Sequence, residues 1–376
     1  MDPIKISEKL ISFKSITPKS NGSLEYIKKI LIKNNFSCEL LKFGNPPVIN
    51  LFANYKGGAG PRICFAGHTD VVPPGDLTNW KFNPFKPKII NGNLFGRGAS
   101  DMKSAIGAFL SATIDFINFN KNFNGSLCFI LTADEEGNAE NGTKKVVEWL
   151  KSKKIKIDFC IVGEPTNPRK LGEMIKIGRR GSINGTIQVF GKQGHVAYPQ
   201  LSSNPIDKLV KICNELKKPL DKGSKNFQPS EIVITSVDVG NKVSNLIPSE
   251  AFIKFNVRFN NNFSSSKIIK TINNRIKKTG AKYKLITKTS GEAFLNYSEE
   301  YTKKVLRTIK RMTKIKTSLS TTGGTSDARF ISKICPVVEF GIVGKTMHQV
   351  NENVAIKDII LLKEIYSEIL NEIFYK

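Results

Sequence analysis

Histidine is scarce in this chain, and the sites where it occurs combine it with acidic residues. The 376-residue sequence contains only His68, His195 and His348. His68 stands two residues before Asp70, directly after the apolar run RICFA. Further carboxylates follow other apolar runs or precede a helical pattern: Asp101, Asp134, Glu135, Glu136 and Glu164. Carboxylates that crowd together repel one another unless a positive charge lies between them.

Two histidines and three or four carboxylates form a ligand set that suits a pair of zinc or related ions. Two such ions, about 3.5–4 Å apart, need one carboxylate to bridge them. Taken singly, each pattern has an ordinary explanation: a His-x-Asp surface pair, a solvated Glu-Glu face or a Gly-Glu-Pro turn. Because all of them follow apolar runs in a chain so poor in histidine, the combination predicts a metal site.

Short apolar runs alternate with helical patterns in the first half of the chain, which predicts an α/β sheet covered by helices on both faces. In open sheets of this kind ligands gather at the carboxyl ends of the strands. We therefore expect the candidate ligands to converge on one edge, with His348 arriving from the C-terminal part. The strands are expected at 62–66, 125–133 and 158–165, and the helices at 24–34, 102–117 and 142–154.

The pattern changes after about residue 180 to the order β-α-β-β-α-β, which is typical of a ferredoxin-like α+β unit. Its elements are expected at 183–191, 204–218, 231–240, 250–260, 264–280 and 282–290. Helical spacing at 298–312, an apolar run at 337–343 and a helix at 356–374 then resume the α/β pattern. Since 376 residues exceed one compact core, we expect a catalytic domain at 1–179 and 293–376 and an inserted domain at 180–292.

Composition restricts the class of protein. The net charge is +26, from 58 Lys+Arg against 32 Asp+Glu. Nucleic-acid binding must therefore be weighed, but the lysines are spread along every expected helix, without a basic tail or a recognisable motif. A positive field that attracts small anions fits this distribution better.

Compartment can also be argued from the sequence. No apolar run reaches the roughly 18–20 residues that a membrane span needs, and the N-terminus lacks the pattern of a signal peptide. Cys64, Cys128 and Cys160 lie inside apolar runs, and no C-x-x-C pair occurs. Buried, reduced thiols and a cytoplasmic location are therefore expected.

The motifs GHTDVVP, GRGASDMK, TADEEG and GEP occur in the order found in the M20 family of di-zinc peptidases and amidohydrolases, which this chain resembles over essentially its whole length. The resemblance implies a zinc-peptidase-like catalytic domain with a mixed, mostly parallel sheet, and an inserted ferredoxin-like domain for dimerisation or as a lid. It also implies which residues hold the two zinc ions. One zinc is held by His68 and Glu164, the other by Glu136 and His348, and Asp101 bridges them, with Co²⁺ as a possible substitute for Zn²⁺.

The resemblance also implies roles next to the metals. Asp70 supports His68, and a carboxylate that accepts the other ring N–H of a zinc ligand fixes its tautomer and orientation. Glu135 is the general base for the water that the metals activate. His195 is an oxyanion-stabilising donor supplied by the partner subunit, which implies a homodimer; from the sequence alone, an ordinary surface histidine fits it equally well.

Longer stretches, GRRGSINGTIQVFGKQGHVAYPQLSSNPI, LSTTGGTSDARF and MHQVNE, resemble one branch of the family. That branch hydrolyses N-succinyl-LL-2,6-diaminopimelate to succinate and LL-2,6-diaminopimelate in lysine and diaminopimelate biosynthesis. Arginine binds such carboxylates through two parallel hydrogen bonds, and a Gly-Gly-Thr turn presents backbone N–H groups to an anion. Substrate contacts are implied for Arg179, Tyr198, Asn245, Arg258, Gly324 and Thr325, although surface ion pairs would also explain the arginines. Gly344 departs from the asparagine of some relatives, which affects a substrate contact and not the metal site.

Three other functions are compatible with parts of the sequence. Another M20 amidohydrolase, such as an acetylornithine deacetylase or a carboxypeptidase, would share the metals and Glu135 but differ in the arginines and the GGTSD loop. A non-catalytic binding protein on the same fold would be expected to lack Glu135 or a ligand. A nucleic-acid binder would show salt-dependent affinity for random DNA.

Overall fold

The computed structural model describes residues 1–375, and the chain divides into two compact units. The first comprises Met1–Gly178, Asn296–Ser320 and the chain from Ser326 to the C-terminus, and the second comprises Arg179–Leu295 and Thr321–Thr325. These units differ from the expected domains in three places, because Arg179, residues 293–295 and Thr321–Thr325 lie with the second unit.

The first unit is built on an eight-stranded mixed sheet in the order β1-β2-β6-β3-β7-β18-β8-β17. The central pairs β6–β3, β3–β7 and β7–β18 are parallel, as is the edge pair β8–β17, whereas β1–β2, β2–β6 and β18–β8 are antiparallel. The strands are β1 (Ser37–Phe43), β2 (Val48–Lys56), β3 (Arg62–His68), β6 (Ser126–Thr132), β7 (Phe159–Val162), β8 (Met174–Lys176), β17 (Ser318–Ser320) and β18 (Val337–Glu339). The expected mixed, mostly parallel sheet is therefore confirmed.

Aromatic contacts show that helices cover both faces of this sheet. Phe65 of β3 and Phe129 of β6 are register partners on one face. There Phe65 stacks on Phe109 of α3 (Ser104–Phe119) with ring centroids 4.3 Å apart. Alternate residues of a strand point to opposite faces. Ala53 of β2 is the register partner of Phe129, so its neighbour Phe52 points to the other face, where the Phe52 ring lies 5.4 Å from that of Trp149 in α4 (Thr143–Ser152).

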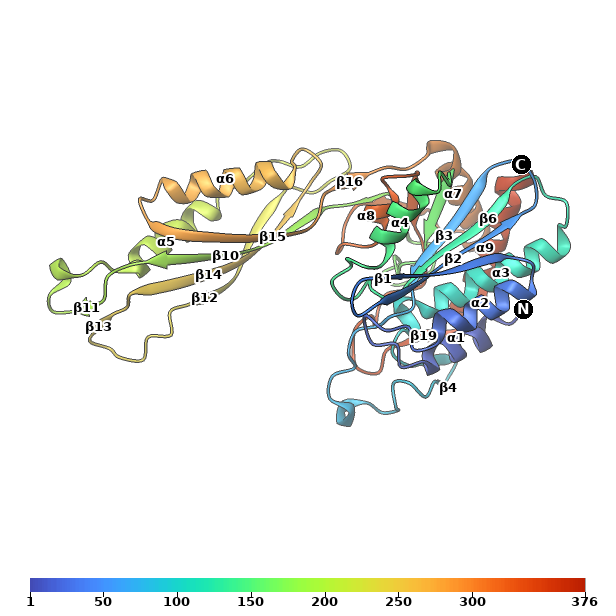
Figure 1. Ribbon diagram of the computed structural model, residues 1–376, viewed down its shortest axis with the longest axis horizontal. Helices are drawn as coiled ribbons and strands as arrows, with labels where there is room; N and C mark the ends of the chain where they lie inside the picture. The colour runs from blue at the N-terminus through green and yellow to red at the C-terminus, as the bar shows by residue number, and fades with distance from the viewer. Residues whose placement is uncertain (376) are drawn as a thin grey trace. The chain divides into compact units, whose positions relative to one another are not determined.

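The helices of the first unit surround this core, with α1, α3 and α9 packed against one another and α4 against α8 (Figure 1). Their bounds are α1 (Pro3–Ser12), α2 (Ser23–Lys33), α3 (Ser104–Phe119), α4 (Thr143–Ser152), α7 (Glu299–Thr313), α8 (Ala328–Ile331) and α9 (Ile356–Tyr375). Side-chain caps fix two of the starts: the Asp2 carboxylate accepts the N–H of Ile4, and the Ser298 hydroxyl accepts that of Tyr301. α3 is buried along almost its whole length, as its run of apolar and small residues requires.

The second unit has a four-stranded antiparallel sheet, in the order β12-β14-β10-β15, with two helices packed on one face (Figure 1). On β14 alternate residues from Ala251 to Phe259 are buried against the helices, which is the pattern of a half-buried strand. The elements follow the expected β-α-β-β-α-β order: β10 (Gly181–Phe190), α5 (Pro205–Leu216), β12 (Glu231–Asp238), β14 (Glu250–Phe259), α6 (Ser265–Lys277) and β15 (Lys282–Gly291).

Smaller ladders complete the two units. In the first unit β19 (Asn353–Ala355), β5 (Asn93–Phe95) and β4 (Lys88–Ile90) form a three-stranded sheet. In the second, β11 (Gly194–His195) pairs with β13 (Leu246–Ile247), and β16 (Phe294–Leu295) pairs with β9 (Gly178–Arg179).

All six cysteines are free, and Cys64, Cys128 and Cys160 are buried as expected. Among the described residues, no helix has both the length and the apolar composition needed to cross a membrane.

Candidate metal centre

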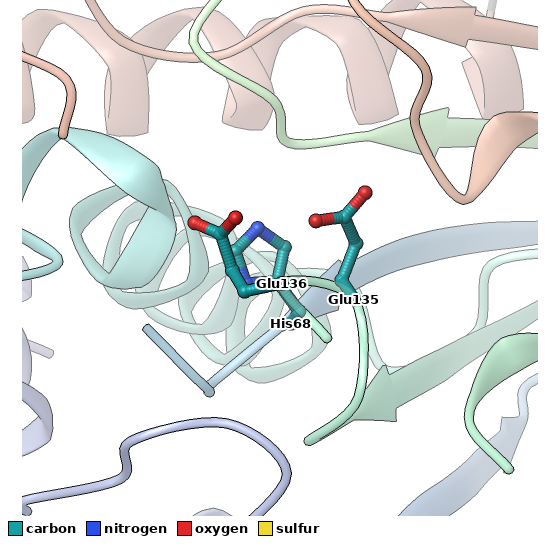
Figure 2. Close-up of side chains that lie close together, drawn as sticks. All are labelled: His68, Glu135 and Glu136. Atoms are coloured by element: carbon teal, nitrogen blue, oxygen red, sulfur yellow. The ribbon is translucent and has the colours of Figure 1, made fainter. Parts of the chain in front are cut away.

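Three neighbouring parallel strands of the first unit end in candidate ligands. His68 is the last residue of β3, Glu135 and Glu136 follow β6, and Glu164 follows β7. Since β6, β3 and β7 are adjacent and parallel, their carboxyl ends meet at one edge of the sheet. Figure 2 shows the side chains of His68, Glu135 and Glu136 gathered at this edge. We expected these residues to converge on one edge of the sheet, and the structure brings them together there.

Asp101 lies between the two imidazoles of the first unit. It belongs to the segment Ala99–Lys103 directly before α3, at a kink where the backbone of Asp101 is not helical (φ −124°, ψ 97°). Its Oδ1 is 3.1 Å from Nε2 of His68, and its Oδ2 is 3.3 Å from Nε2 of His348. Nε2 of His348 is also 2.7 Å from Oε1 of Glu136. One carboxylate thus faces both histidines with different oxygens, which is the arrangement of a bridging ligand.

These side chains form two groups that share Asp101. The first is His68, Asp101 and Glu164, the second is Asp101, Glu136 and His348, and within each group one ligand atom per residue lies within 4.8 Å of the others. Oxygen and imidazole donors in sets of three, with one carboxylate common to both, fit two divalent cations. A third group, His68, Glu135 and Glu136, overlaps them. The donor set therefore suits the expected pair of ions.

The electrostatics of the cluster also fit bound cations. Hydrogen bonds to Asp101 and Glu136 raise the pKa of His348 to about 10. Burial would raise the pKa of Asp101, but hydrogen bonds from His348 and His68 outweigh it and hold that pKa below its ordinary value. The imidazoles thus retain protons among these carboxylates, and a divalent cation would supply the same positive charge.

Glu135 has an environment suited to holding a proton. Burial, followed by the negative charge of Glu164, raises the pKa of Glu135 well above its ordinary value. Asp327, buried in the first unit, adds to this effect. A carboxylate whose pKa is raised is a better proton acceptor at neutral pH.

Asp70 supports the cluster through different atoms than expected. Nδ1 of His68 donates to the backbone carbonyl of Asp70 at 2.9 Å, whereas the Asp70 carboxylate is 3.7 Å from Nδ1. That carboxylate instead accepts the backbone N–H groups of Glu135 at 3.3 Å and Glu136 at 3.0 Å. The expectation that the Asp70 carboxylate accepts the ring N–H of His68 is therefore wrong, because the backbone carbonyl of Asp70 accepts it instead. The backbone orients His68, and the buried side chain holds the loop that carries Glu135 and Glu136.

The third histidine lies in the second unit, on β11. His195 is exposed, and its Nδ1 accepts the backbone N–H of Ala197 at 3.1 Å. In the neutral ring the proton then sits on Nε2, which can donate. Its ring centroid is 5.9 Å from that of Tyr198, and the backbone of Val196 donates to the carbonyl of Asn245. His195, Tyr198 and Asn245 are thus neighbours.

The two expected arginines of the second unit differ in setting. Arg179 is buried, and its Nη1 donates to the carbonyls of Thr322 at 3.4 Å and Gly324 at 3.2 Å, so it contacts the loop that also carries Thr325. A Cβ at Gly323, which has φ +101°, would lie 2.5 Å from that Nη1. Arg258 on β14 is half-buried beside Arg180; burial and then this like charge lower its pKa.

Two further polar residues of the first unit were not identified from the sequence. Glu352, in the stretch MHQVNE, is fully buried and accepts hydrogen bonds from the segment that carries Asp101. Lys103 is fully buried, donates to the carbonyl of Phe13 at 3.0 Å, and has its pKa lowered by burial to about 7. Both stand in motifs quoted from the sequence, GRGASDMK and MHQVNE, but no local pattern reveals their roles, because their partners are distant in sequence. Gly344 donates its N–H to the carbonyl of Asn167 at 2.9 Å.

Known proteins resemble this chain over its full length. The chain is 50% identical over 376 residues to a succinyl-diaminopimelate desuccinylase of Wolbachia pipientis subsp. Culex pipiens, covering 100% of this chain and 94% of that protein. It is 50% identical over 379 residues to one from Pelagibacter ubique, covering 99% and 98%. Residues 64–372 match the peptidase family M20/M25/M40.

Solved structures agree on the fold. A metallo-carboxypeptidase of the M20 family from Sulfolobus solfataricus superimposes with a TM-score of 0.80 at 18% identity, covering 98% of both chains. A Bacillus subtilis protein described as a dinuclear metal binding peptidase from the M20 family superimposes with a TM-score of 0.73 at 15% identity, covering 99% of this chain and 97% of the other. Sequence and fold lead to the same assignment: the chain belongs to peptidase family M20/M25/M40.

Proposed function

We propose that this protein hydrolyses N-succinyl-LL-2,6-diaminopimelate to succinate and LL-2,6-diaminopimelate, a step of diaminopimelate and lysine biosynthesis. The reaction class is supported by one geometric observation: Asp101 is shared by two sets of metal ligands, with Glu135 beside them. The substrate is supported by the identity of about half of all residues, over the full length, to desuccinylases from two organisms.

We infer that two Zn²⁺ ions, replaceable by Co²⁺, occupy the two groups of ligands. His68 and Glu164 would hold one, Glu136 and His348 the other, and Asp101 both. When bound, such ions activate a water and polarise the amide carbonyl. The donor types and the shared carboxylate support this assignment.

Glu135 acts as the proton carrier in this proposal. Its carboxylate takes a proton from the attacking water as the new C–O bond forms, and returns it to the amine nitrogen as the C–N bond of the amide breaks. The raised pKa of Glu135 suits both halves of this transfer, because a weaker acid is a stronger base towards water. The Asp70 carboxylate keeps Glu135 in place by accepting the backbone N–H of Glu135.

Residues of the second unit bind substrate in this proposal. Nε2 of His195 donates to the oxygen that develops negative charge, and it comes from the partner subunit of a homodimer. Contacts with the carboxylates and polar groups of the substrate are assigned to Arg179, Tyr198, Asn245, Arg258, Gly324 and Thr325. The proton position on His195 and the proximity of Arg258 to a second arginine support these roles. The six free thiols support work in the reducing cytoplasm.

Comparing two substrates on the zinc-loaded protein tests this function. N-succinyl-LL-2,6-diaminopimelate should be cleaved to succinate, the activity should disappear when a chelator removes zinc, and it should return when zinc is restored. N-acetylornithine should be a poor substrate. Cleavage of N-acetylornithine alone would assign the chain to a deacetylase with the same metal chemistry, and cleavage of neither by zinc-loaded protein would contradict an amidase.

A further inference from the structure

Glu352 is a fully buried carboxylate whose two oxygens are both occupied by hydrogen bonds to one segment of chain. Its Oε1 accepts the backbone N–H groups of Ser100 at 2.8 Å and Asp101 at 3.0 Å. Its Oε2 accepts the backbone N–H of Gly98 at 3.1 Å and Nη1 of Arg97 at 2.8 Å. A buried charge is tolerated only when it is satisfied in this way. The carboxylate therefore fixes the turn on which Asp101 stands.

Arg97 connects this turn to a second segment. Its Nη1 also donates to the carbonyl of Gln349 at 3.2 Å, and its guanidinium lies 5.0 Å from the ring centroid of Trp80. Arg97 is itself buried, with 2% of its surface exposed. The pair Arg97–Glu352, called the clamp below, thus ties residues 97–101 to residues 348–352. Each of these segments carries a candidate ligand, Asp101 in the first and His348 in the second.

The backbone of His348 gives an independent reason for a clamp. His348 has φ +62°, in the left-handed region that non-glycine residues seldom adopt. Such a conformation persists only where the surrounding structure determines it. The hydrogen bond from Arg97 to Gln349 and the burial of Glu352 fix the chain on the C-terminal side of this residue.

We propose that the clamp is a positioning device which sets Asp101 against His348 and thereby controls how tightly the second cation is held. The inference rests on the proposed two-cation centre. Two of the three ligands of the second group, Asp101 and His348, stand on clamped segments. In the first group only Asp101 does, because His68 ends β3 and Glu164 follows β7. Loss of the clamp therefore weakens the second ion more than the first.

Glu352→Gln tests the clamp with little change in volume. The amide replaces one accepting oxygen by a donor that faces backbone N–H groups or the guanidinium. Glu372→Gln is a matched control, because Glu372 on α9 is also buried and is 3.2 Å from Nη2 of Arg307 on α7. The zinc-loaded full-length proteins are equilibrated with increasing concentrations of a chelator, and the zinc retained per chain is counted.

We expect Glu352→Gln to lose one zinc at a free zinc concentration about 10–100-fold higher than the wild type does, as is typical when a partner of a metal ligand is removed. The other zinc and both ions of Glu372→Gln should be released as in the wild type, and excess zinc should restore turnover of Glu352→Gln. Equal weakening of both ions, or no change in either, would overturn the inference.

A second variant covers the case in which Glu352→Gln does not fold. Arg97→Lys keeps the positive charge but replaces the planar guanidinium, whose Nη1 donates to both Gln349 and Glu352, by a compact ammonium. It should show the same selective loss with a smaller shift. Wild-type protein that holds two ions and hydrolyses the substrate, while both variants retain zinc normally, would refute the clamp alone. Wild-type protein that holds no second ion would refute the two-cation centre together with the clamp.

Discussion

Three metal ligands of the first unit, His68, Asp101 and Glu164, are held differently from His195 and Tyr198 of the second unit, although His348 is exposed and Arg179 is buried. His68, Asp101 and Glu164 are almost completely buried. His68 and Glu164 stand at the ends of parallel strands, and the backbone N–H of Asp101 donates to the distant Glu352. His195 and Tyr198 are exposed, Tyr198 with 57% of its surface accessible, and of the two only His195 stands on the short β11–β13 ladder. Rigid placement suits groups that must share a cation, whereas exposed placement suits groups that meet a substrate. Changes in the first unit should therefore affect turnover, and changes in the second should mostly affect binding of the transition state or substrate.

Glu135→Gln should have the largest effect. The amide keeps the size of the side chain but cannot accept the proton of water, so turnover should fall by about 10²–10⁴-fold. Zinc content should be unchanged, because Glu135 belongs to neither group that contains Asp101. Steady-state kinetics and zinc counting on the same preparation measure both. Turnover near that of the wild type would remove Glu135 from the mechanism.

His195→Ala should lower turnover by about 10²–10³-fold, the usual result of removing one oxyanion donor, without loss of zinc. Mixing this variant with Glu135→Gln tests whether His195 of one subunit completes the site of the other subunit. If the partner subunit supplies His195, heterodimers contain one complete site, and random exchange in a symmetric dimer restores about a quarter of wild-type activity. Confirmed subunit exchange without recovery would contradict completion by the partner.

Arg258→Lys should act on the substrate rather than on the metals. Lysine keeps the charge but loses the paired hydrogen bonds to a carboxylate, and a hydrogen bond to a charged group contributes about 1.5–3 kcal/mol. We expect kcat/KM for the succinyl substrate to fall by about 10–100-fold, mainly through KM. Kinetics with equal zinc content provide the measurement, and a loss confined to kcat would argue against a binding role.

Asp70→Asn should have the smallest effect of the four. The backbone carbonyl that orients His68 is retained, so the zinc beside His68 should stay. The hydrogen bonds that the side chain of residue 70 accepts from the backbone N–H groups of Glu135 and Glu136 become weaker. This loss should cost about 1 kcal/mol, which lowers turnover about fivefold. Release of the zinc beside His68 would show instead that the carboxylate is the essential support of that ligand.

The sequence predicted most elements whose side chains form one uninterrupted pattern. β6 is a continuous apolar run and β14 an alternating one, and both lie within a residue of their expected bounds. β1, β2 and α1 were not predicted. Residues of β1 are mostly exposed or half-buried, as expected of the outer strand of a sheet, and β2 mixes asparagine and lysine with apolar residues.

The candidate site likewise contains residues that the sequence could predict and contacts that it could not. Its ligands could be named because each follows an apolar run or carries a family motif, and the sheet brings them together. The role of the Asp70 backbone carbonyl could not be predicted, because any residue type offers that atom. Glu352 accepts from Asp101 across 251 positions of sequence, so only the fold reveals the contact.

Anomalous diffraction from crystals of the zinc-loaded protein would test most directly the claim that Asp101 joins two cations. We expect two zinc peaks about 3.5–4 Å apart, one beside His68 and Glu164 and the other beside Glu136 and His348, with one oxygen of Asp101 directed at each. A single peak, or a pair of peaks that Asp101 does not bridge, would contradict it.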